Sequence, residues 1–158
     1  QRNVPLACLL GRGDKRLLNI GLAGVQVSAG HTAVLGARSY EPEELDFLKA
    51  SGVRIIDSVE LAQRGFADCL HEALAIVSAA PAGFGVTLDL DAIDPLLAPG
   101  VGSPEPEGLS ARDVLEAVSG IAGLPGFRAL EIVEYNPDRD RHGATASLIS
   151  ALIARRRP

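Results

Sequence analysis

The chain has 158 residues, a formal net charge of −5 and 47% hydrophobic residues, values typical of one globular domain with a sizeable core. The acidic balance argues against a nucleic-acid-binding surface, and no run approaches the roughly 18 uncharged apolar residues that a membrane span needs. Cys8 and Cys69 lie far apart without metal-site spacing. We therefore expect free thiols and a reducing compartment, the cytoplasm.

Extended and helical patterns alternate along most of the chain. Residues 11–30 are rich in glycine, show no hydrophobic period and are expected to form a loop. Short apolar runs bounded by turn residues predict strands at 31–38, 53–56, 84–90 and 128–133. Helical spacing and capping signals such as Pro42, Gly52 and Ser110 predict helices at 43–49, 66–79, 111–121 and 145–154. This order predicts an α/β fold with a parallel sheet, right-handed crossovers and helices on both faces, in one domain over residues 1–158.

Two aspartates close the apolar run at 84–90. Asp89 and Asp91 are two residues apart, so in a strand both carboxylates would lie on the same face. The carboxyl end of a parallel strand is where open α/β folds bind ligands, and neighbouring carboxylates suit a hard divalent cation. The alternative is that one aspartate caps a turn and the other is solvated.

A third carboxylate follows the last predicted strand. Glu134 comes directly after the apolar run that ends at Val133, so it should emerge at the same edge of the sheet. Its alternative role is a rim residue that pairs with a surface arginine. Asp94 precedes Pro95 and is expected to be a turn residue. The loop 98–104 should cover the strand ends, with glycines that allow a close approach to a ligand.

These segments resemble the signatures of the ureohydrolase family, which includes arginase, agmatinase and formiminoglutamase. The stretch 89–95 reads Asp-Leu-Asp-Ala-Ile-Asp-Pro, and 98–104 reads Ala-Pro-Gly-Val-Gly-Ser-Pro. The second signature is represented by Glu134-Tyr135-Asn136-Pro137 with Thr145-Ala146 beyond it. The resemblance covers about residues 32–155 and corresponds to the C-terminal part of the family fold.

The resemblance implies a three-layer α/β/α fold and a centre of two Mn²⁺ ions. These ions activate a hydroxide that attacks a guanidino or amidino carbon and releases urea or a related product. By the same resemblance, Asp89 and Asp91 are metal ligands and Glu134 holds the guanidinium group. The stretch Gly36-Ala37-Arg38 is followed by Glu41 and Glu44, which could reach an amino group of the substrate. Both could equally be ordinary first-turn acids of a helix.

Two expected ligand segments, Gly-Gly-Asp-His and Asp-Ala-His-x-Asp, are absent from the sequence. The chain contains no Met and begins with Gln1, a residue too large for efficient removal of an initiator Met. We therefore expect the N-terminal part of the family fold to be missing here. His31, His71 and His142 are in the wrong sequence contexts to replace the missing ligands.

Two hypotheses follow. The first is a manganese hydrolase of arginine metabolism acting on a small guanidino compound, in which this chain supplies the C-terminal part and is a poor hydrolase by itself. The second is a non-catalytic regulatory or assembly subunit with an incomplete metal site. The family resemblance also implies a homo-oligomer, a trimer or hexamer, and a separate N-terminal segment is a possible partner. The sequence leaves open which guanidino compound is the substrate.

Overall fold

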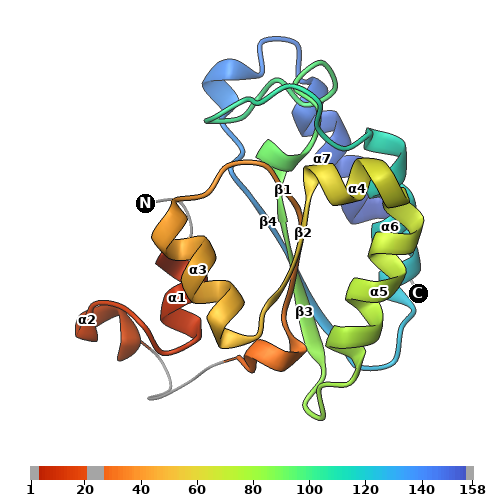
Figure 1. Ribbon diagram of the computed structural model, residues 1–158. Coiled ribbons are helices and arrows are strands. Elements are labelled where there is room, and N and C mark those ends of the chain that lie inside the picture. The colour runs from red at the N-terminus through yellow and green to blue at the C-terminus, as the bar shows by residue number, and fades with distance from the viewer. Residues whose placement is uncertain (1–3, 21–26, 156–158) are drawn as a thin grey trace. The chain divides into compact units, whose positions relative to one another are not determined.

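The structure is a computed structural model and describes residues 4–20 and 27–155 (Figure 1). The chain divides into two compact units, Gln1–Ala80 and Pro81–Pro158. Each unit contains one ladder of two parallel strands, as the alternating sequence pattern predicts. None of the helices in the described ranges combines the length and the apolar content that crossing a membrane requires.

The first unit is built around strands β1 (Ala33–Ala37) and β2 (Arg54–Asp57), which pair in parallel. Helix α3 lies on one side of this ladder, and α4 and α5 lie on the other (Figure 1). Ile56, Cys69 and Ala73 form the buried cluster between β2 and α5. The helices of this unit are α1 (Val4–Leu9), α2 (Lys15–Leu18), α3 (Pro42–Ser51), α4 (Ser58–Arg64), α5 (Phe66–Ser78) and the 3₁₀ helix η1 (Ala29–His31).

Local chemistry explains where these helices begin and end. Helix α3 has Pro42 in its first turn and ends at Gly52, whose φ of 89° is left-handed. Helix α4 begins after Asp57, whose carboxylate accepts a hydrogen bond from the Glu60 N–H at 2.8 Å. The strands and helices predicted in this unit are confirmed to within about three residues, but α4 was not predicted. The predicted loop at 11–30 is wrong at α2 and η1, and its residues 21–26 lie outside the described ranges.

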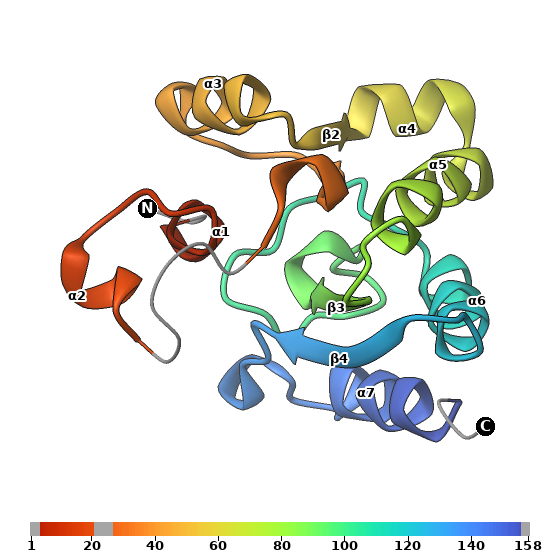
Figure 2. The same cartoon turned by 90° about the horizontal axis from the view of Figure 1, so that it is seen from below.

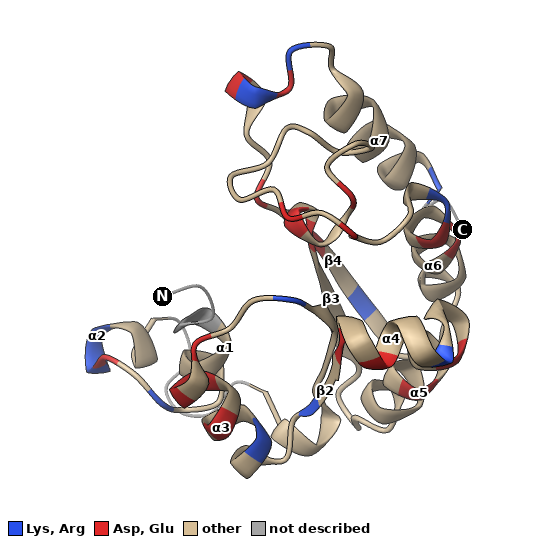
Figure 3. Ribbon diagram, turned by 45° about the horizontal axis from the view of Figure 1, so that its top comes forward, with Lys and Arg blue, Asp and Glu red and all other residues tan. Residues whose placement is uncertain are grey.

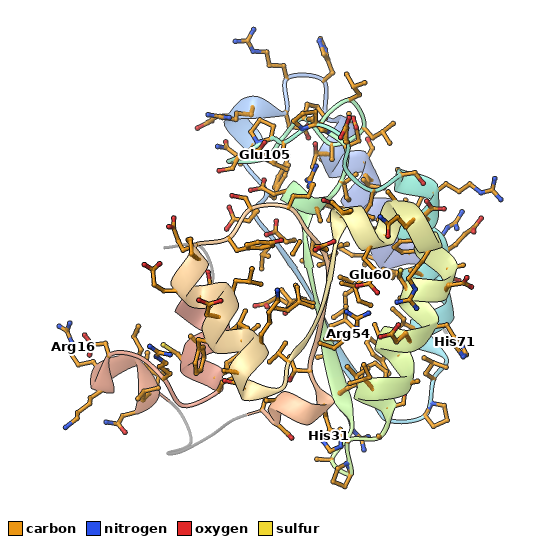
Figure 4. The ribbon with its side chains drawn as sticks, viewed as in Figure 1. Arg16, His31, Arg54, Glu60, His71 and Glu105 are labelled. Carbon is orange, nitrogen blue, oxygen red and sulfur yellow. The ribbon has the colours of Figure 1, made fainter. Side chains whose placement is uncertain are left out.

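Four charged side chains form a closed group between β2, α4 and α5, here called the Arg54 ring: Arg54, Glu60, Arg64 and Glu72. Arg54 pairs with Glu60, and both are labelled in Figure 4; it also pairs with Glu72 at 2.5 Å. Arg64 also pairs with both glutamates, through Glu60 and at 2.5 Å through Glu72. Each carboxylate therefore meets two guanidinium groups. The hydrogen bonds from Arg54 and then from Arg64 lower the pKa of Glu60 to about 2.

The second unit contains strands β3 (Phe84–Asp89) and β4 (Phe127–Val133), paired in parallel with Asp89 opposite Val133. Helices α6 (Ala111–Ala122) and α7 (Ala144–Ala154) contact each other and lie beside this ladder (Figure 2). The Ser110 hydroxyl caps α6 by accepting from the Asp113 N–H at 3.0 Å, as predicted. The buried core joins both helices to the segment after β3, through Leu90, Ile93, Ala98, Val101, Val114, Val118, Leu148 and Leu152. The carboxyl ends of β3 and β4 therefore lie together at one edge.

Replacing Glu60 with Gln should lower the free energy of unfolding at neutral pH. The pKa of Glu60 in the folded chain, about 2, is below its ordinary value of 4.5. The stabilisation is therefore fully present above about pH 4.5 and is lost as the pH falls toward 2. Urea unfolding followed by circular dichroism should show wild type and variant converging over that pH range.

Glu116→Gln is the matched control for this substitution. Glu116 forms an ion pair with Arg112, one turn earlier in the same helix, and the side chains of Glu116 and Arg112 are 58% and 82% exposed. An exposed pair of this kind contributes little, so the control should differ little from wild type at any pH. An equal loss of stability in the two variants would contradict a special role for the Arg54 ring.

Candidate functional site

Strand β3 ends at Asp89 because the side chain of this residue turns the backbone. Its Oδ1 accepts a hydrogen bond from the Asp91 N–H at 2.8 Å and caps the 3₁₀ helix η2 (Leu90–Ala92). Asp91 therefore lies in η2, and the expectation that both carboxylates share one face of a strand is wrong. The two residues still remain neighbours at the carboxyl end of β3.

The segment of residues 98–103, here called the site loop, contacts the residues that follow both strands of the β3–β4 ladder. The Ser103 N–H points at Asp91 Oδ1 over 3.4 Å, a long hydrogen bond. Val101 forms an antiparallel bridge with Tyr135, and the Asn136 N–H donates to the Gly100 carbonyl at 2.8 Å. The predicted loop over the strand ends is thus confirmed. Figure 3 shows acidic segments gathered around this edge of the second unit.

Glu134 leaves β4 in an unusual backbone conformation. It follows Val133 directly and has a φ of 68°, in the left-handed region that non-glycine residues rarely adopt. A Cβ built on Gly102 would lie 3.4 Å from Glu134 Oε2, so this carboxylate reaches the backbone of the site loop. The predicted third carboxylate therefore does lie at the same strand edge. Such conformations persist only where surrounding contacts hold them, and they are found most often at functional sites.

The carboxylates fit a manganese or magnesium ion in chemistry but not in number. Oxygen donors suit hard divalent cations, which take six or more ligands. Within residues 4–20 and 27–155, no group of three or more His, Cys, Asp or Glu residues could hold a metal. His31 lies in η1, and His71 and His142 are exposed on α5 and in the turn before α7. Asp89 and Asp91 thus form at most part of a coordination sphere.

The acids near the start of α3 differ from each other in their surroundings. Glu41 is exposed and makes no side-chain capping bond to the helix. Glu44 is half-buried, and its Oε1 is shielded from solvent without a hydrogen-bond partner among the described residues. Asp94 accepts from the Leu96 N–H at 2.9 Å, which confirms it as a turn residue.

The sequence interpretation missed Asp140 and did not predict the burial of Thr145, which it named only as part of the second signature. They are 7% and 0% exposed, respectively. A Cβ on Gly100 would lie 2.6 Å from the Asp140 Cβ, so a glycine at this position makes room for the packing of Asp140. The available signal was an acidic residue a few positions before a predicted helix, where a carboxylate can satisfy unpaired N–H groups.

Comparison with known proteins defines the class of the chain. The sequence model of the arginase family matches residues 18–156, a range that includes β3, the site loop and Glu134. The chain therefore belongs to the arginase family, the ureohydrolase family predicted from its sequence signatures.

Particular relatives are similar over most of this chain. The arginase of Brevibacillus brevis is 36% identical over 151 residues, which are 96% of this chain and 51% of that protein. The guanidinopropionase of Pseudomonas aeruginosa is 36% identical over 117 residues, 73% of this chain and 36% of that protein. The solved arginase of Bacillus caldovelox has a TM-score of 0.90 and 33% identity over 96% of this chain and 50% of that structure. The arginase-like α/β fold is thus confirmed, and the chain spans about half the length of the arginases it matches.

Substituting Glu134 should separate backbone strain from side-chain chemistry. Because φ is left-handed at this position, Glu134→Gly should be more stable than Glu134→Ala by about 1 kcal/mol. Glu131 in β4 is a matched control, since there glycine should be less stable than alanine by roughly 0.5–1 kcal/mol. Urea unfolding of the four variants gives the two differences. Finding alanine the more stable substituent at both positions would contradict the left-handed conformation of Glu134.

Proposed function

We propose that this chain supplies the carboxylate-bearing part of a manganese-dependent hydrolase that cleaves the C–N bond of a small guanidino or amidino compound. The observation that carries the proposal is the gathering of Asp89, Asp91 and Glu134 at one end of the β3–β4 ladder. The site loop meets Asp91 through Ser103 and approaches Glu134 through Gly102. The same loop thus approaches Asp91, a proposed metal ligand, and Glu134, which is proposed to bind the guanidinium group.

Asp89 and Asp91 would hold the metal. The bond from the Asp91 N–H to Asp89 Oδ1 fixes the orientation of one carboxylate before any ion binds. The Ser103 N–H does the same, less tightly, for the other. When bound, Mn²⁺ supplies Lewis acidity that makes water a nucleophile near neutral pH. Further ligands must come from outside the described carboxylates, since two aspartates cannot complete a coordination sphere.

Glu134 would bind the guanidinium group of the substrate. A carboxylate can accept two parallel N–H bonds from this planar cation, which fixes its orientation as well as its position. The left-handed backbone at Glu134 turns the chain out of β4 at this residue and brings its side chain to Gly102. The backbone conformation and the site loop thus both restrict the position of the Glu134 side chain. A fixed carboxylate would hold the guanidinium carbon in line with an attacking nucleophile.

Glu41 and Glu44 would bind an amino group at the far end of the substrate. Glu41 is exposed at the start of α3 and makes no side-chain capping bond, so its carboxylate is accessible to a cation. Relatives named arginase and guanidinopropionase support a substrate with a guanidino group. Of these, the acidic pair favours a substrate such as arginine, which also carries an amino group.

A cytoplasmic homo-oligomer, trimeric or hexameric, completes the proposal. The two cysteines are unpaired, as expected in a reducing compartment. A separately supplied segment carrying histidine and aspartate ligands is a second expected partner, because the donor set described above is incomplete.

Asp89→Asn should lower Mn²⁺-dependent urea release by about 100-fold or more, because a metal ligand is needed whatever the substrate. Glu41→Gln should cost less, about tenfold, and mainly in KM for arginine. The assay uses the natural protein with any partner that co-purifies, and Mn²⁺ affinity is measured in parallel by electron paramagnetic resonance.

Asp94→Asn is the matched control, because its amide oxygen can still accept from the Leu96 N–H. It should retain near-normal activity and Mn²⁺ affinity. If wild-type protein released no urea from any guanidino compound with Mn²⁺ present, the hydrolase proposal would be overturned. Unchanged Mn²⁺ affinity in Asp89→Asn would remove Asp89 from the metal site.

A further inference from the structure

Asp140 is a buried carboxylate that takes no part in the proposed metal or substrate contacts. It lies just after the 3₁₀ helix η3 (Pro137–Arg139), a few residues before α7, and is 7% exposed. A buried charge is costly unless it is fully hydrogen-bonded. Its surroundings therefore have to supply several donors, and these donors show what the residue holds together.

Three donors converge on the Asp140 carboxylate. Oδ1 accepts from the Thr145 N–H at 3.0 Å, and Oδ2 accepts from the Ala146 N–H at 2.8 Å. The Tyr135 hydroxyl donates to Oδ2 at 3.2 Å. Two of these donors are first-turn N–H groups of α7, which have no partner within the helix. The third belongs to the residue directly after Glu134.

A second path runs from Asp140 to the site loop. Thr145, whose N–H is held by Asp140, accepts from the Gly100 N–H through its own Oγ1 at 2.8 Å. The Gly100 carbonyl in turn accepts from the Asn136 N–H at 2.8 Å. Gly100 packs closely on Asp140, because a Cβ built at this glycine would lie 2.6 Å from the Asp140 Cβ. Tyr135, Asn136 and Gly100 are thereby linked to the same carboxylate.

We infer that Asp140 is a positioning residue for guanidinium binding: through Tyr135 on one side and through Thr145 and Gly100 on the other, it holds Glu134 against Gly102. This inference rests on the proposed role of Glu134 in binding the guanidinium group. Asp140 itself touches neither metal nor substrate. Its effect is to keep the Glu134 carboxylate in one place, so that little ordering is needed when the cation binds.

An aspartate suits this position better than the isosteric asparagine. The three donors approach both oxygens, and an amide has only one acceptor oxygen. Burial raises the pKa of Asp140, but the hydrogen bonds from Ala146, Thr145 and Tyr135 outweigh it and hold the pKa below its ordinary value of 3.8. The group is therefore a carboxylate at neutral pH, able to accept from all three donors.

Tyr135→Phe and Asp140→Asn test the inference in the natural protein, with guanidinium chloride at non-denaturing concentration as the probe. Binding is followed through the NMR shift of the Glu134 amide, and amide exchange at Gly100 and Asn136 reports the order of the loop. Tyr135→Phe, which removes only one hydroxyl, should weaken guanidinium binding roughly tenfold. Asp140→Asn should weaken it further and speed exchange at Gly100. In the arginine assay, both should raise KM more than they lower kcat.

Two controls keep the outcomes distinct. Leu152→Ala removes a fully buried side chain near the other end of α7 and destabilises the unit without touching the hydrogen-bond path. Equal weakening of guanidinium binding by Leu152→Ala and Asp140→Asn would overturn the positioning role. Normal binding in both Tyr135→Phe and Asp140→Asn, with binding lost in Glu134→Gln, would also overturn it. Unchanged binding in Glu134→Gln would instead refute the proposed role of Glu134.

Discussion

The second unit depends on one buried anion, the carboxylate of Asp140. Without it, two first-turn N–H groups of α7 and the Tyr135 hydroxyl would each lose their acceptor. A buried polar network of this kind is stable only when every member is satisfied. The regular elements meet this requirement by themselves, whereas the turn between β4 and α7 and the site loop meet it through Asp140 and Thr145. The irregular segments that carry the candidate site are therefore ordered by a polar centre, next to an apolar core formed by α6, α7 and the ladder.

All three candidate carboxylates lie where regular structure is interrupted. Asp89 ends β3 by accepting from the chain two residues on, Asp91 sits in the resulting 3₁₀ turn, and Glu134 has a left-handed φ directly after β4. Each interruption has a local cost that neighbouring contacts must offset. The parallel ladder brings the two strand ends together, and each interruption ends the regular backbone at the candidate residue. The function proposed for this edge would thus depend on departures from the fold's own regularity.

The sequence predicted the periodic elements and the strand-end positions of the candidate carboxylates, but not the local geometry of these residues. Helix α6 was predictable because Ser110 caps it and its apolar residues repeat at helical spacing, and the signatures located Asp89 and Glu134 at strand ends. The 3₁₀ placement of Asp91 depends on a side-chain bond that competes with the ladder, and the φ of Glu134 depends on contacts with a loop more than 30 residues earlier. The burial of Asp140 and Thr145 was not predicted because a polar residue gives no periodic signal of burial. Helix α4 has seven residues, too few for a clear hydrophobic period.

The Arg54 ring has a consequence for the response of the first unit to heat. Its two arginines and two glutamates are each only about one-third exposed or less, so folding strips part of their hydration. That dehydration penalty falls as temperature rises, because the hydration of ions carries a negative entropy. A closed ring of ion pairs therefore becomes relatively more stabilising on warming, while the stabilisation per unit of buried apolar surface levels off. Loss of order on heating should thus begin outside β2, α4 and α5, and the Arg54 ring should be among the last features of its unit to melt.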